Sequence, residues 1–316
     1  MVVEITSKCI LDAVKEIVTH PGKFHADELF AVAYLREAGC TAPVSRRVPT
    51  PEDLANPRVL IVDVGGQYDP YLLNFDHHQN GADLVRENGV PYSSFGLVVK
   101  HFAPVGAGVY ERFDKLLVQP IDAHDNGRWP QRDSENPTLA LSAVLGWFNP
   151  TGPTTPPEMD KVFLKTVDIV RQVLENTMAQ VCAWCDAKEK LQNKEFTEQC
   201  GSILVLKEYL PWLGHIQSPE FRWVDLVVFP DTLRGGWKVQ TVPVAEGSKD
   251  PRVPLPTEWW GASGAELQKV LEDEGILTFP GESPEHIFCA KSGFIAGATH
   301  RDNALNIARA AYVASR

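Results

Sequence analysis

The first half of the chain alternates short apolar runs with segments of helical periodicity. Residues 16–20 and 58–64 are short runs rich in Val and Ile, the second nearly continuous, as in parallel strands buried on both faces. Between them, apolar residues recur at helical spacing over 27–38. This alternation predicts an α/β fold with a mainly parallel sheet flanked by helices. Further helices are predicted at 91–102, 108–118 and 137–148.

The second half begins with a loop and then changes pattern. Pro and Gly cluster over 149–157, and a long helical segment is predicted from about 158 to 196. Strands are predicted at 203–206, 224–229, 237–242, 287–290 and 294–298, with helices at 265–274 and 302–314. We therefore predict a domain at 1–155, a helical connector at 156–200 and a smaller C-terminal α/β domain at 201–316.

Composition narrows the classes of function. A chain of 316 residues is long enough for two domains. Its net charge of −11 argues against a protein that mainly clamps duplex nucleic acid by neutralising phosphates. Six scattered cysteines, no targeting pattern and no apolar run of about 20 residues predict a cytoplasmic protein without a membrane span. A nuclear or organellar location and a homodimer stay open.

Metal-capable side chains gather in several places along the chain. Asp76, His77 and His78 are adjacent in a polar stretch, where packing cannot explain all three. Two predicted strands end on similar groups, His20 and Asp63, and parallel strands present their carboxyl ends at one edge of a sheet. Further candidate ligands are His25, Asp27 and Asp125, while Glu28 is either a site residue or a carboxylate favoured by the helix dipole.

Carboxylate and imidazole groups without thiolates suit Mn²⁺, with Mg²⁺ or Co²⁺ as alternatives. There are more candidate ligands than one ion needs. Two ions about 3.5–4 Å apart would share a bridging carboxylate, acidify a water into a hydroxide nucleophile and stabilise charge on a phosphoryl group. Asp63, at the end of a buried strand, is the candidate bridge.

Four ordered motifs carry a resemblance to a known family. They are Thr-His-Pro-Gly-Lys-Phe-His-Ala-Asp-Glu at 19–28, Ile-Val-Asp-Val-Gly-Gly at 61–66, Phe-Asp-His-His-Gln at 75–79 and Asp-Ala-His-Asp-Asn-Gly at 122–127. They resemble the motifs of the DHH phosphoesterase superfamily and, more narrowly, the melanocyte proliferating gene (MYG-type) family. The resemblance continues through Pro-Trp at 211–212 and Ser-Gly-Phe-Ile-Ala-Gly at 292–297, and so covers almost the whole chain.

The resemblance implies a DHH-type N-terminal domain and a 3′ to 5′ RNA exonuclease that uses two manganese ions. It implies that His20, His25 and Asp63 hold one ion, and that Asp27, Asp63, His77 and Asp125 hold the other. His78 would act beside the reacting oxygen, and Asp76 would orient a histidine. His25 stands where the wider superfamily has an aspartate. Asp122 is an alternative ligand to Asp125, although the Asp-Asn-Gly context favours Asp125.

A small-residue segment near the C-terminus is the candidate substrate contact. Gly293 and Gly297 lie between a predicted strand and helix, where backbone N–H groups can approach an anion. With His300 and Arg301 they resemble the superfamily's glycine-rich substrate segment, and Lys291 could add a phosphate contact. A tight turn is the alternative interpretation. Among eight tryptophans that could stack on unpaired bases, Trp259 and Trp260 are the first pair to test.

Short single-stranded RNA or another phosphodiester is therefore the predicted substrate. Two alternatives remain open at this point. One is a phosphatase for small substrates such as pyrophosphate, oligonucleotide fragments or cyclic dinucleotides. The other is a regulatory module that binds metal without turnover.

Overall fold

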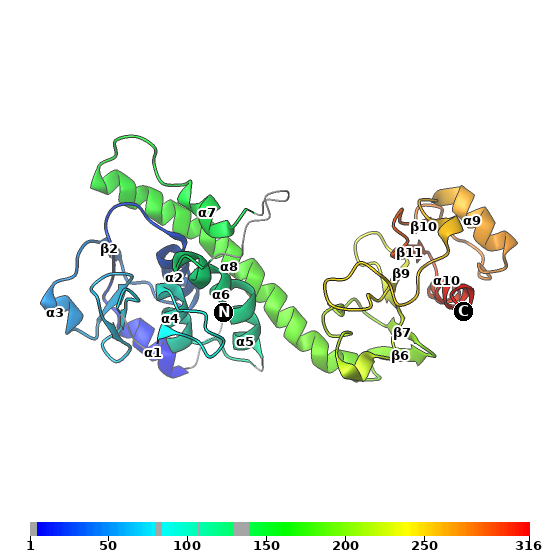
Figure 1. Ribbon diagram of the computed structural model, residues 1–316, viewed down its shortest axis with the longest axis horizontal. Helices are drawn as coiled ribbons and strands as arrows, with labels where there is room; N and C mark the ends of the chain where they lie inside the picture. Colours follow the sequence, from blue (N-terminus) through cyan, green and yellow to red (C-terminus); the bar gives the residue numbers. More distant parts are fainter. Residues whose placement is uncertain (1–4, 80–83, 107, 129–138) are drawn as a thin grey trace. The chain divides into compact units, whose positions relative to one another are not determined.

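A computed structural model describes residues 5–79, 84–106, 108–128 and 139–316 (Figure 1). The chain divides into two compact units between Cys182 and Ala183. This division falls within the long helix α8 (Pro156–Gln192), which occupies most of the segment predicted as a connector. The helix ends at Gln192, before the predicted end at Phe196, and the next strand begins at Thr197.

The first unit contains a mainly parallel sheet, as the sequence predicted. Its strands are β1 (Glu16–Thr19), β2 (Val44–Arg46), β3 (Val59–Val62), β4 (Tyr68–Asp69) and β5 (Asn74–Phe75). Within the described residues their order is β2-β1-β3-β5-β4, and only β4 runs antiparallel to its neighbour. Every residue of β3 is buried, which explains why its sequence is apolar throughout.

The first unit also contains α-helices, some of which contact this sheet. They are α1 (Ile5–Ala13), α2 (Ala26–Glu37), α3 (Pro51–Leu54), α4 (Ser94–His101), α5 (Val109–Phe113), α6 (Gln119–Asp125) and α7 (Leu141–Gly146). A π-helical turn, Asp114–Val118, joins α5 to α6. Helix α2 contacts α4, α6, α7 and β3, and its residues from Ala26 to Leu35 are all buried. The start of the helix predicted at 137–148 lies outside the described residues.

The second unit begins with the last turns of α8 and combines a mixed sheet with two further α-helices. Its strands are β6 (Thr197–Cys200), β7 (Ile203–Leu206), β8 (Leu226–Pro230), β9 (Trp237–Thr241), β10 (Phe288–Cys289) and β11 (Ile295–Ala298). In the described chain their order is β10-β11-β9-β8-β7-β6, with only β7 and β8 parallel. Helix α10 (Arg301–Ala314) packs across β7, β8, β9 and β11, and α9 (Gly264–Asp273) contacts β10. The α/β prediction is confirmed for both units.

None of the helices in the described ranges combines the length and the apolar character that a membrane span requires.

Candidate metal centre

Three strands of the first sheet end at the same edge. In the parallel register Thr19 lies beside Val62, and Val62 lies beside Phe75. The next residue of each chain segment is therefore His20, Asp63 and Asp76. The strand pattern predicts that His20 and Asp63 meet, and their side chains lie 3.4 Å apart, from Nε2 to Oδ2.

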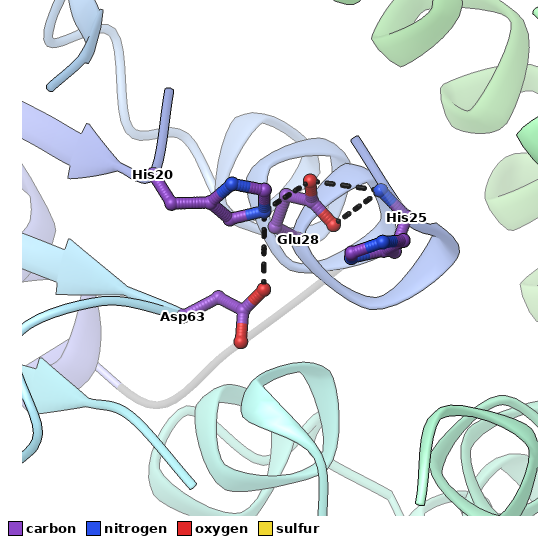
Figure 2. A group of neighbouring side chains, drawn as sticks. All are labelled: His20, His25, Glu28 and Asp63. Carbon is purple, nitrogen blue, oxygen red and sulfur yellow. Dashed lines mark hydrogen bonds and ion pairs between the residues drawn. The ribbon is translucent and has the colours of Figure 1, made fainter. Parts of the chain in front are cut away.

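Glu28 lies between two of the predicted ligands (Figure 2). Its Oε1 is 2.9 Å from Nε2 of His20, and its two oxygens accept the backbone N–H of His25 at 2.9 and 3.0 Å. His25 caps the N-terminus of α2, and Glu28 completes the capping box from the first turn. The same carboxylate therefore caps the helix and contacts the cluster, so the two interpretations of Glu28 are compatible.

His77 joins the cluster from the other side of Asp63. Its Nε2 lies 3.3 Å from Oδ1 of Asp63, 3.1 Å from Oδ2 of Asp125 and 4.0 Å from Oδ2 of Asp27. The two oxygens of Asp63 therefore face different histidines. Three groups have possible ligand atoms within 4.8 Å of one another: His20, His25, Glu28 and Asp63; Asp63, His77 and His78; and His25, Asp27 and Asp125.

Asp63 has an unusual backbone conformation. Its φ of 59° lies in the left-handed region, which few residues other than glycine, asparagine and aspartate adopt readily. Such conformations cost about 1–3 kcal/mol and persist where surrounding contacts hold them. Here the Asp63 N–H donates to the carbonyl of Phe75 at 3.2 Å, and the Ser94 hydroxyl donates to Oδ1 at 3.2 Å.

The electrostatics of the cluster favour a bound cation. Both oxygens of Asp27 are buried and accept no hydrogen bond from the described residues, and its pKa is raised by burial and by the charges of Asp63 and Asp125. Although burial opposes it, contact with Glu28 raises the pKa of His20 to about 9. Burial likewise opposes the charge on His77, but Asp125 and Asp63 raise its pKa to about 10.

A positive charge on the histidines thus compensates the crowded carboxylates. A divalent ion would supply the same charge and bind both the carboxylate oxygens and the imidazole nitrogens. The donor set therefore fits the oxygen- and nitrogen-binding ions predicted from the sequence.

Asp76 and His78 form a separate pair beside the cluster. The carboxylate of Asp76 accepts hydrogen bonds from the Gly66 N–H at 2.6 Å and from the His78 N–H at 3.1 Å, and lies 2.7 Å from Nδ1 of His78. Burial would raise the pKa of Asp76, but these hydrogen bonds lower it. The side chain of His78 is 63% exposed. Asp76 therefore orients His78 rather than His77.

Asp122 belongs to a different network from Asp125. Its Oδ1 accepts the Ser93 hydroxyl at 2.5 Å and the Gly96 N–H at 3.1 Å, and its Oδ2 pairs with Arg86 at 2.6 Å. Burial raises the pKa of Asp122 to about 7, against the opposing effect of Arg86. Asp122 thus ties α6 to the N-terminus of α4, whereas Asp125, three residues later, lies in the cluster.

A cavity of about 670 Å³ opens onto the cluster. Its lining includes His25, Asp63, His77, His78 and Asp125, together with small residues of α7. His124 also lines it, and neither His124 nor Ser94 was predicted from the sequence. The Asp-Ala-His-Asp motif could have suggested His124, but no sequence signal marks Ser94.

The predicted substrate segment of the second unit has internal packing partners. A Cβ on Gly293 would overlap the indole of Trp260, and one on Gly297 would crowd the Phe288 ring. The N–H groups of Thr299 and His300, at the start of α10, donate to the carboxylate of Glu282 at 2.6 and 3.2 Å. Arg301 pairs with Glu198 and Asp302. These contacts favour the tight-turn interpretation for the glycines, and Lys291 is exposed beside them.

The two tryptophans of the predicted stacking pair differ in exposure. Trp259 is 2% exposed and belongs to the core of the second unit, so it offers no stacking surface. Trp260 is 42% exposed and donates its indole N–H to the carbonyl of Leu255. Trp147, after α7 in the first unit, is 69% exposed.

The fold and the cluster define an α/β protein with a candidate centre for divalent metal ions. The chain belongs to the MYG1 exonuclease family, because residues 16–312 match its model, described as "Uncharacterised protein family (UPF0160)". Similar proteins include the MYG1 exonuclease of Mus musculus, 32% identical over 95% of this chain and 85% of the relative, and that of Homo sapiens, 31% identical over 96% and 87%. The MYG1 protein of Dictyostelium discoideum is 28% identical over 92% and 94%. No solved structure matches significantly.

Proposed function

We propose that this chain is a divalent-metal-dependent phosphodiesterase that removes nucleotides from the 3′ end of short single-stranded RNA. Relatives named exonucleases, similar over almost the whole chain, support the reaction class. The observation that carries the metal chemistry is the position of Asp63, whose two carboxylate oxygens face His20 on one side and His77 on the other. A carboxylate in this position suits a bridge between two ions.

In this proposal, His20, His25 and Asp63 hold one ion, while Asp27, Asp63, His77 and Asp125 hold the second. Mn²⁺ is the first candidate, and Mg²⁺ or Co²⁺ are alternatives. The Pro21 carbonyl, 3.0 Å from Nδ1 of His20, orients that ring. Glu28 contacts Nε2 of His20, the nitrogen that also faces Asp63, so it lies among the possible ligand atoms of the first ion (Figure 2).

Two bound ions would acidify a water molecule and stabilise the charge that develops on the phosphoryl group. The chain's own contribution beside them is His78. Asp76 holds its Nδ1, so its Nε2 is left to exchange a proton with the leaving oxygen of a substrate in the cavity. Gly293, Gly297, His300, Arg301 and Lys291 remain proposed substrate contacts. For the Thr299 and His300 N–H groups, this role requires that a substrate anion replace Glu282.

The test is an assay of metal-stripped protein with added Mn²⁺. The substrates are a short single-stranded RNA labelled at either end, pyrophosphate and a cyclic dinucleotide. We expect stepwise shortening of the RNA from its 3′ end, and none before metal is added. Release of phosphate from pyrophosphate alone would instead identify a small-substrate phosphatase, and no turnover of any substrate would identify a binding module.

Asp63→Asn is the sharpest variant, because asparagine also adopts the left-handed backbone and leaves the shape unchanged. We expect it to lower kcat by more than about 100-fold, beyond the effect of a group that only supports a metal site. Asp168→Asn, on an exposed face of α8, is the matched control. Equal activity of the two variants would contradict the two-ion proposal.

A further inference from the structure

Helix α7 forms one wall of the metal cavity with its smallest residues. Ser142, Ala143 and Gly146 line the cavity, whereas Leu145 turns away and is buried. Trp147 follows directly and keeps helical backbone angles, φ −73° and ψ −12°. It therefore lies one helical turn beyond Ala143, on the flank of the cavity wall.

The segment that carries Trp147 is fastened to the metal-binding loop. The side chain of Asn149 accepts the Phe24 N–H at 2.9 Å and donates to the Phe24 carbonyl at 2.8 Å. Phe24 immediately precedes His25, one of the proposed ligands. The residue that follows the cavity-lining helix is thus a large aromatic one, two residues before the Asn149 anchor.

Burial does not account for this side chain. Trp147 is 69% exposed, whereas Trp212 and Trp259 are almost fully buried in the second unit. An exposed indole at the end of a helix that lines the cavity offers a flat surface on which an unpaired base can stack, and such stacking tolerates any base. A small anion such as pyrophosphate would make no use of it.

We propose that Trp147 stacks on a base of the substrate strand whose phosphate lies at the metal centre. Trp147 is then a residue that selects single-stranded nucleic acid over base-free phosphate esters. This inference rests on the proposed phosphodiesterase activity and adds its substrate class. Small residues at 142, 143 and 146 leave room for the sugar and phosphate, while the indole contacts the base.

The experiment compares two oligonucleotides of equal length, one intact and one with abasic nucleotides at its 3′ end. Removing one base–aromatic stack should lower kcat/KM for the intact strand about 5- to 150-fold, mainly through KM. The ratio of kcat/KM for the intact strand to kcat/KM for the abasic strand should therefore fall by that factor in the Trp147→Ala variant. Trp147→Phe should keep most of the preference, because a phenyl ring still stacks.

Tyr71→Ala is the matched control. Tyr71 is 91% exposed but precedes β5, so it lies at the edge of the parallel sheet opposite to the metal centre. Its removal should leave the preference unchanged. An unchanged preference in Trp147→Ala would overturn the proposal, and altered self-association of that variant with unchanged preference would identify a protein interface instead.

The assay also separates this inference from the proposed function. If the wild-type protein cleaves neither strand, the phosphodiesterase proposal fails. Fluorescence anisotropy of the two labelled strands then decides the stacking question. Tighter binding of the intact strand that Trp147→Ala abolishes would support stacking, and equal binding of both strands would refute it.

Discussion

Removal of the Asp122 carboxylate should destabilise the first unit and loosen the candidate metal centre. Asp122→Ala deletes a buried acceptor that pairs with Arg86 and receives the Ser93 hydroxyl and the Gly96 N–H. Breaking a buried ion pair by removing one partner costs about 3–5 kcal/mol. Arg86 keeps its bidentate pair with Asp114, so we expect a cost at the lower end, about 3 kcal/mol.

The uncapped Gly96 N–H adds a second cost of about 1 kcal/mol, as for a lost helix cap. We therefore expect the free energy of unfolding of the first unit to fall by about 4 kcal/mol, a large part of the usual 5–15 kcal/mol of a domain. The metal centre should weaken too. Asp122 joins α6, which carries Asp125, to α4, whose Ser94 contacts Asp63.

Urea denaturation measures the change in the free energy of unfolding. The measurement is made near pH 8, because the Asp122 carboxyl, with a pKa of about 7, is then mainly ionised. Hydrogen exchange of peptides from α4 and α6 localises the change, and Mn²⁺ titration reports the metal affinity. Asp168→Ala, whose side chain is 74% exposed, is the control and should change stability by less than about 0.5 kcal/mol. If Asp122→Ala lowers the free energy of unfolding by less than about 1 kcal/mol, the pair contributes no more than an exposed ion pair, and the prediction is refuted.

Two further predictions concern the histidines of the cluster. In metal-free protein the raised pKa values of His20 and His77 contribute stability that is fully present below their ordinary pKa of 6.5. This stability should be lost as the pH rises through about 9 to 10, so the urea midpoint should fall over that range. A midpoint that does not change with pH would contradict the prediction. Glu28→Gln should weaken Mn²⁺ affinity about 10- to 100-fold in a calorimetric titration, because the Glu28 carboxylate contacts Nε2 of His20 and lies among the possible ligand atoms. Unchanged affinity would show that Glu28 only caps the helix.

Much of the centre follows from local patterns. The apolar run of β3 predicts a buried parallel strand, and the polar residue that ends it, Asp63, must then lie at the carboxyl edge of the sheet. The same reasoning places His20. Pattern alone could not separate the two possible functions of Glu28, because a helix-capping carboxylate and a group that contacts a ligand histidine occupy the same position in the sequence.

Other features depend on packing between distant segments. Asp122 and Asp125 are three residues apart on one helix, and only Arg86 and the start of α4 show that Asp122 supports the fold. The C-terminal glycines resemble an anion site in sequence, yet the ring of Phe288 and the indole of Trp260 explain why they are small. The exposure of Trp147 could not be predicted either, because it depends on which distant segments cover the side chain.

The left-handed conformation of Asp63 limits which residues evolution or a designer can place there. The proposed chemistry requires a carboxylate, which admits aspartate and glutamate. The backbone favours glycine, asparagine and aspartate, and glutamate is not among them. Aspartate satisfies both requirements, whereas the conservative exchange to glutamate would add backbone strain at the turn that ends β3. Position 63 is thus constrained twice, once by its side chain and once by its main chain.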